Sequence, residues 1–355
     1  MKNNLLKLFF VVVLFCSVSL LFNSSSEAGE CERTGTSINI DQQDDGTNEF
    51  VVNGIEASGY GQMNCVEEPL FYKVSFYKVL FCREDPYVSN GNPDLSSCIG
   101  TIFETNLTTG KEVIVQPGLK TDLLDEALVL PVGTYPYAAI IVDNHIGLKH
   151  HESYIDKDGS TAVSMRGATG AGAICYTRDG KATTYTGTAA GTHTSGLHPS
   201  GLAFTAAISD TRSTLTMECG SALPNDWSDT AKYFSYEIID SIDGGACDTA
   251  GNCATTFNAY VDYEADDSGV GGQAASTLLK ANEQTIATQR SDAVKIGYFL
   301  KFTTPKTIDD DINSLELNFT TSTSVSVDHS KDGTTVYGMK VGANPFGVQF
   351  VIGTE

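Results

Sequence analysis

The run from Phe71 to Cys82 alternates apolar residues, many of them aromatic or β-branched, and constrains the fold more than any other feature. Such residues suit the pleated surface of a strand, so the run predicts a β-strand. Because successive side chains of a strand point to opposite faces, strict alternation divides the run into two sets. One face is expected to carry Tyr72, Val74, Phe76, Lys78, Leu80 and Cys82, and the other Phe71, Lys73, Ser75, Tyr77, Val79 and Phe81.

Similar strand patterns follow along the whole chain and are separated by turn-forming residues, as at Pro117-Gly118 and Pro131-Val132-Gly133. Short strands at this spacing predict antiparallel β-sandwiches. Only residues 273–290 have a spacing of apolar residues that predicts a helix, and residues 121–127 could form one helical turn. The expected strands cover residues 98–103, 112–115, 127–130, 137–143, 202–208, 213–218, 233–239, 257–263, 294–302, 314–319, 322–327, 335–341 and 347–352.

One turn and the strand after it have a counterpart in known proteins. The stretch reads Leu130-Pro-Val-Gly-Thr-Tyr-Pro-Tyr-Ala-Ala-Ile-Ile-Val142 and resembles the turn that leads into a core strand in prealbumin-like secreted modules. The resemblance implies a sandwich fold, shared by some surface and pilus-subunit domains, and it transfers no functional residue. An unrelated sandwich with the same turn is the alternative.

The first 28 residues have the pattern of a secretory signal peptide. Lys2 and Lys7 give a positive start, and an apolar run of fifteen residues, 8–22, follows. Small residues around Ala28 suit signal peptidase, which places the mature start at Gly29. The alternative is an uncleaved N-terminal anchor, although the run is short for a membrane span. No second apolar run of membrane length follows, so no membrane span is expected in the mature chain.

Cleavage removes one of the nine cysteines, Cys16, and leaves eight. An even number of cysteines in an exported protein favours disulfides over metal thiolates. Eight cysteines allow many pairings, and pairing between sequence neighbours fits modular domains best. The expected disulfides are Cys31–Cys65, Cys82–Cys98, Cys175–Cys219 and Cys247–Cys253.

The predicted fold is therefore all-β, with two disulfide-stapled antiparallel β-sandwiches of prealbumin-like or jelly-roll-like type after the signal peptide. The N-terminal sandwich is expected at 29–155 and the C-terminal one at 202–355. Between them, residues 156–201 are rich in Gly, Ala and Thr and are expected to form loops or a thin hairpin that buries little.

The chain is acidic, with 22 Lys and Arg against 44 Asp and Glu and a net charge of −22. Such a field repels phosphate backbones and anionic lipids, so neither nucleic acid nor an anionic membrane surface is an expected partner. Cations, neutral ligands and other proteins remain.

Two groups of residues have the composition of metal sites. Asp156, Asp158 and Ser160 alternate as in a calcium-binding turn, although the remaining ligands of an EF-hand loop are missing, and an ordinary solvated turn is the default. No other cofactor is expected. Five histidines also cluster in the sequence but lack a metal-binding spacing: His145, His150, His151, His193 and His198.

No serine-hydrolase or phosphate-binding signature occurs, so the chain is expected not to be an enzyme, with an exported hydrolase kept as the last alternative. The single tryptophan, Trp227, suits either the core or an aromatic surface that stacks on sugars. Asn106 and Asn318 begin glycosylation sequons.

The leading hypothesis is an exported structural or adhesive protein of the cell surface, with the periplasm as an alternative location. It includes the subunits of extracellular filaments that self-associate, or join other surface proteins, through terminal strands or sheet edges. The candidate terminal strands are residues 36–40 with 50–52, and 346–352. The second hypothesis is a secreted β-sandwich module that binds carbohydrate or a small ligand.

Overall fold

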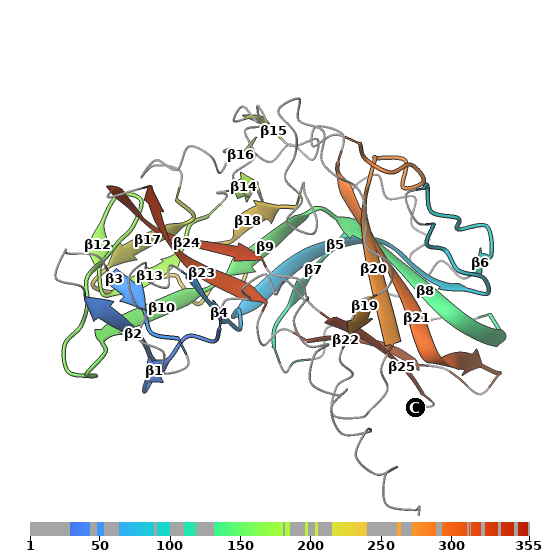
Figure 1. The fold of residues 1–355 in the computed structure, drawn as a ribbon, viewed down its shortest axis with the longest axis horizontal. Coiled ribbons are helices and arrows are strands. Elements are labelled where there is room, and N and C mark those ends of the chain that lie inside the picture. The colour runs from blue at the N-terminus through green and yellow to red at the C-terminus, as the bar shows by residue number, and fades with distance from the viewer. Residues whose placement is uncertain are drawn as a thin grey trace, which may run out of the picture.

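The fold is that of a computed structural model (Figure 1), and the described part of the chain consists of strands, turns and loops. The expected all-β class is therefore confirmed. Residues 1–28, the expected helical turn at 121–127, Asn106, His193, His198, Cys247 and Cys253 lie outside the described residues. The described residues are 29–42, 48–52, 64–88, 91–99, 110–117, 119, 131–179, 182–184, 196–197, 203–204, 215–239, 261–263, 272–288, 293–310, 312, 314–320, 324–332, 335–343 and 347–353.

The largest sheet has ten strands and runs from the centre to the right of Figure 1. Its main path is β14 (Ala182–Thr184), β18 (Ser235–Ile238), β9 (His145–Lys149), β5 (Phe71–Cys82), β8 (Gly133–Asp143), β21 (Lys295–Ile308), β20 (Gly272–Leu279) and β19 (Val261–Tyr263). Two short strands, β6 (Cys98–Ile99) and β7 (Lys111–Val115), pair with β5.

A six-stranded sheet forms the left-hand part of Figure 1. It contains β1 (Arg33–Thr34), β2 (Ser37–Gln42), β10 (His151–Asp156), β13 (Ile174–Thr177) and β17 (Met217–Gly220), with β3 (Asn48–Phe50) beside β2. A smaller sheet joins β24 (Thr335–Ala343), β23 (Val325–Asp332) and β4 (Asn64–Glu67). The remaining pairs are β22 (Ser314–Thr320) with β25 (Gly347–Gly353), β11 (Met165–Arg166) with β12 (Ala171–Gly172), and β15 (Gly196–Leu197) with β16 (Ala203–Phe204).

The sheets combine strands from both ends of the chain. β8 pairs with β21, β9 with β18, and β4 with β23, so each pair joins residues on opposite sides of the 156–201 segment. One hydrophobic cluster contains Ile38 from the six-stranded sheet, Phe81 from the ten-stranded sheet and Phe350 from β25. The boundaries expected at residues 155 and 202 therefore do not separate the sheets.

Strand β5 forms as predicted, but its faces change partway along. The register of β5 against β8 shifts between Phe76 and Lys78, as it does at a β-bulge. One extra residue reverses the alternation, so Val79 and Phe81 join Phe76 in the main core, while Leu80 belongs to a separate cluster. The strict two-face division expected from the sequence is wrong beyond the bulge.

The ten-stranded sheet branches at Asn144, between β8 and β9. The Asn144 side chain is fully buried, and its Nδ2 donates to the carbonyls of Ile239 and Ala293, each at 2.9 Å. Ile239 follows β18, and Ala293 precedes β21. One amide group therefore holds the two strands that diverge from the β8–β9 segment.

The helix expected at residues 273–290 is wrong. Gly272–Leu279 is strand β20, which pairs with β21 along its whole length, and a turn follows it. Leu278 and Leu279 are buried on different sides, in different hydrophobic clusters, as neighbouring residues of a strand are. Pairing with a long neighbouring strand prevails here over a weak helical pattern.

The Gly-rich stretch after residue 157 packs more tightly than expected. A Cβ atom at Gly172 would clash with the backbone of Gly220 in β17, so only glycine permits this close approach. Met165 and Ala168 are buried beside it. The expectation that this segment buries little is wrong for its described part, because small residues let the backbone itself pack.

Three of the expected disulfides form, and they join different elements. Cys82–Cys98 links β5 to β6, and Cys175–Cys219 links paired positions of β13 and β17. Cys31–Cys65 joins the N-terminal segment to β4, 34 residues further along the chain. Disulfides of this kind persist in oxidising compartments outside the cytoplasm.

Candidate functional site

The four residues Lys149–Glu152 lie where the chain leaves the ten-stranded sheet and enters the six-stranded sheet. Thr177 in β13 fixes this crossing. The His150 N–H donates to Thr177 Oγ1 at 3.1 Å, and the Thr177 N–H donates to the His150 carbonyl at 2.9 Å. Because side chains alternate along an extended chain, His150 and Glu152 point to one side, and Lys149 and His151 to the other.

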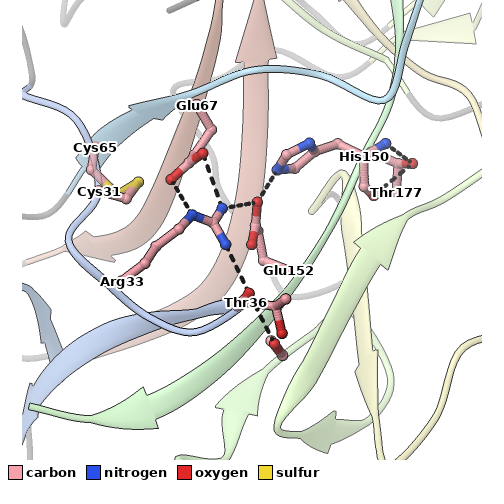
Figure 2. Close-up of polar contacts among 9 residues, drawn as sticks. Cys31, Arg33, Thr36, Cys65, Glu67, His150, Glu152 and Thr177 are labelled. Atoms are coloured by element: carbon pink, nitrogen blue, oxygen red, sulfur yellow. Dashed lines mark hydrogen bonds and ion pairs between the residues drawn. A yellow bond between two sulfur atoms is a disulfide. The ribbon is translucent and has the colours of Figure 1, made fainter. Parts of the chain in front are cut away.

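The first side holds a cluster of charged groups, which we call the ion cluster: Arg33, Glu67, His150 and Glu152 (Figure 2). Arg33 Nε donates to Glu67 Oε1 at 3.0 Å, and Arg33 Nη2 donates to Glu152 Oε1 at 2.6 Å. His150 Nε2 lies 2.7 Å from the same Glu152 oxygen. Arg33 Nη1 also donates to the carbonyl of Thr36 at 2.8 Å. A single guanidinium thus joins strands β1, β4 and β10.

The two carboxylates of the ion cluster differ electrostatically. Burial raises the pKa of Glu152, but the adjacent His150 and Arg33 outweigh it and lower that pKa overall. Burial raises the pKa of Glu67, and the hydrogen bond from Arg33 does not compensate for it. Glu67 is therefore the more easily protonated of the pair.

The ion cluster and the first disulfide fasten the same two segments. Arg33 lies two residues after Cys31, and Glu67 lies two residues after Cys65, so each segment contributes one cysteine and one charged group. Figure 2 shows the disulfide beside the guanidinium. The N-terminal segment is consequently fixed both covalently and by ion pairs. The equal spacing, with each charged residue two positions after a cysteine, is visible in the sequence. The charges alone did not identify Arg33 as the partner of Glu67.

The second side holds aromatic rings around a lysine, which we call the aromatic cluster: Lys149, His151, Tyr176, Trp227 and Tyr233. Lys149 Nζ donates to the carbonyls of Trp227 and Asp229 at 2.6 and 2.7 Å. It also lies 4.6 Å from the centre of the Trp227 ring. Trp227 contacts His151, Tyr176 and Tyr233, with ring centres 5.4, 5.8 and 5.3 Å apart.

Lys149 is only 1% exposed, whereas the rings of Trp227, Tyr176 and Tyr233 are half-buried. Burial lowers the pKa of Lys149, and the charges of Asp229 and Asp226 only partly offset this. The cation is therefore held by ring faces and backbone carbonyls. Trp227 belongs neither to the core nor to a fully exposed surface, the two alternatives that the sequence left.

The candidate calcium turn has a local structural role. The Ser160 N–H and Oγ both donate to the Asp156 carboxylate, at 2.7 and 2.9 Å, and these bonds lower the pKa of Asp156. Asp158 is exposed in the same turn. In the described part of the chain, no three or more His, Cys, Asp and Glu side chains form a group that could hold a metal ion. Calcium binding stays an untested prediction.

The described histidines of the sequence cluster have separate partners. His145 Nδ1 lies 2.6 Å from Asp143, His150 contacts Glu152, and His151 contacts the ring of Trp227. His150 and His151 point to opposite sides of the chain, so these two imidazoles do not converge.

Comparison with known proteins gives no relative: no family profile, no curated protein and no solved structure matches this chain. The described residues contain no helix that is long and apolar enough to span a membrane.

Proposed function

We propose that the chain is an exported structural or adhesive protein of the cell surface. The observation that carries the proposal is the double attachment of the N-terminal segment, through Cys31–Cys65 and through Arg33 with its two carboxylates. If the signal peptide is removed before Gly29, the new N-terminus lies two residues from this disulfide. A chain end held in this way resists unravelling outside the cell, where no chaperone would refold it.

Assembly between copies, if it occurs, would use sheet edges. Strand β2 pairs with β1, β3 and β10, and β25 pairs with β22, so both candidate terminal strands already have partners within the chain. Donating either strand to another copy would break these ladders, and β25 would also withdraw Phe350 from the core. The proposal therefore favours contacts through exposed edges, which present unpaired backbone groups.

The test is to express the full chain with a C-terminal tag in a secreting host and to analyse the culture medium, the cell surface and the cytoplasm. We expect a product that begins near Gly29, has no free thiol under non-reducing conditions, and occurs outside the cytoplasm. Negative-stain microscopy of that product at high concentration then distinguishes filaments from separate surface molecules. Retention in the cytoplasm with reduced cysteines would refute the proposal.

A further inference from the structure

The half-buried rings of the aromatic cluster form a surface that its structural role does not require. Packing against Lys149 uses the side of Trp227 that faces the buried ammonium. Tyr176 and Tyr233 lie 6.2 Å apart at nearly perpendicular angles, and both remain partly accessible to solvent. Three adjacent, partly exposed aromatic rings are an unusual feature of an acidic surface and indicate recognition of an apolar face.

Tyr233 has a strained backbone conformation. Its φ of 66° lies in the left-handed region, which residues with a bulky side chain rarely adopt. The backbone is held on both sides, because its N–H donates to Asp179 at 3.2 Å and its carbonyl accepts from Thr177 Oγ1 at 2.6 Å. Its hydroxyl donates to Asp226 at 2.5 Å. Retained strain at a fixed side chain is characteristic of binding sites.

A further half-buried tyrosine, Tyr236, lies on the same face of the ten-stranded sheet as Lys149. Tyr236 in β18 pairs with Gly147 and lies so close to it that a Cβ at Gly147 would stand 3.0 Å from the tyrosine ring. Gly147 and Lys149 are two residues apart in one strand and share a face, about 7 Å apart. The ring centre of Tyr236 lies 5.8 Å from that of His145, and Phe234, two residues before Tyr236, is buried. The partly exposed rings of the proposed site are therefore those of Trp227, Tyr176 and Tyr233.

Charge decides which ligand fits. The net charge of −22, with Asp179, Asp226 and Asp229 around the rings, repels anions. A cationic ligand is also disfavoured, because the ammonium of Lys149 already lies against the Trp227 ring. A neutral ligand with apolar ring faces and many hydroxyl groups remains. The carboxylate of Asp226 and the ammonium of Lys232, 2.9 Å apart, can accept from and donate to such hydroxyls.

We propose that Trp227, Tyr176 and Tyr233 form a binding site for a neutral oligosaccharide. The sugar rings stack on the aromatic faces, and the 225–232 loop supplies hydrogen bonds to the hydroxyls. The site is separate from the ion cluster and does not depend on where the chain is located, so it can be tested independently of the surface role.

The chain has one tryptophan, so its intrinsic tryptophan fluorescence reports on Trp227 alone. The mature protein would be titrated with neutral oligosaccharides of glucose, mannose, xylose and N-acetylglucosamine, and with heparin and choline as charged probes. We expect at least one neutral series to change the emission in a saturable way, with affinity rising with oligosaccharide length. Heparin and choline should leave the emission unchanged.

Variants locate the binding surface. Tyr176→Ala should weaken binding about tenfold or more, as expected for the loss of one stacking ring. Tyr137→Ala, which removes a half-buried tyrosine of β8 outside this surface, should bind like the wild type. Trp227→Ala should abolish binding and Trp227→Phe should retain part of it, both measured by calorimetry after circular dichroism confirms folding. Binding of none of the neutral probes, binding only of heparin or choline, or an unaffected Tyr176→Ala variant would overturn the proposal.

Discussion

The two sides of Lys149–Glu152 bury a cation by different means. In the ion cluster, the guanidinium of Arg33 is paired with two carboxylates. In the aromatic cluster, the ammonium of Lys149 lies against aromatic rings and donates to two backbone carbonyls. The pKa of Arg33 is raised, because its bonds to Glu67 and Glu152 outweigh burial, whereas burial lowers that of Lys149.

The difference follows from the shape of each group. A planar guanidinium donates in several fixed directions and can join three strands, whereas an ammonium is compact and suits a ring face with two carbonyls. The ion cluster is nearly closed, with the Glu152 side chain only 5% exposed, while the aromatic cluster remains open at its rim. One side of the strand is therefore closed, and the other side leaves aromatic rings accessible, as the proposed oligosaccharide site requires.

The largest expected effect is that of Arg33→Ala. The variant leaves Glu67 and Glu152 near each other without a shared cation, and loss of one member of a buried ion pair costs about 3 to 5 kcal/mol. Chemical denaturation monitored by circular dichroism measures the change in free energy of unfolding. The control is Lys232→Ala, which removes an exposed ion pair with Asp226 and should change the free energy of unfolding only slightly. Equal effects for the two variants would mean that the ion cluster contributes little.

Lys149→Met comes next in size. It keeps the length of the side chain but removes the ammonium that bonds the carbonyls of Trp227 and Asp229, of which Asp229 also accepts from the Lys232 N–H. We expect a loss of about 1 to 3 kcal/mol. Because those carbonyls belong to the 225–232 loop, the Trp227 emission should also shift towards that of an exposed indole. Lys232→Met, in an exposed position of the same loop, should change neither stability nor emission appreciably. A stable variant with unchanged emission would show that Lys149 does not hold the loop.

The acid response separates the two carboxylates of the ion cluster. The pKa of Glu152 is lower in the folded chain than its ordinary value of 4.5, so its contribution to stability is lost as the pH falls below 4.5. The pKa of Glu67 is raised, so its contribution to stability is instead lost as the pH rises above 4.5. Melting temperatures between about pH 3 and 7 should therefore depend less steeply on pH in Glu152→Gln than in the wild type. They should depend more steeply in Glu67→Gln. Identical slopes in both variants would contradict this assignment.

The strands and cysteine pairs were predictable because they depend on local patterns. Alternation marked β5, and proximity in sequence paired Cys31 with Cys65 and Cys82 with Cys98. The bulge after Phe76 was not predictable, because a single extra residue reverses the faces without changing the composition. Nor was the pairing of β8 with β21, because loop lengths do not specify which distant strands meet.

The candidate site was less predictable than the fold. His150 and His151 were noted as members of a cluster of five histidines, and a metal was the function considered for that cluster. Only the extended chain sends one towards Glu152 and the other towards Trp227. Lys149, next to them, had no distinguishing signal, because a buried lysine is recognisable only from the rings and carbonyls that the 225–233 loop brings to it.

The smallest expected effect on stability is that of Tyr233→Asn, which compares the two roles of the aromatic cluster within one residue. Asparagine tolerates the left-handed backbone better, so the strain relieved offsets part of the lost ring contacts. The melting temperature should therefore change little, while oligosaccharide binding, measured by calorimetry, should fall about tenfold. If stability fell sharply as well, the ring would serve mainly to pack against Trp227, and the aromatic cluster would resemble the ion cluster in being a purely structural device.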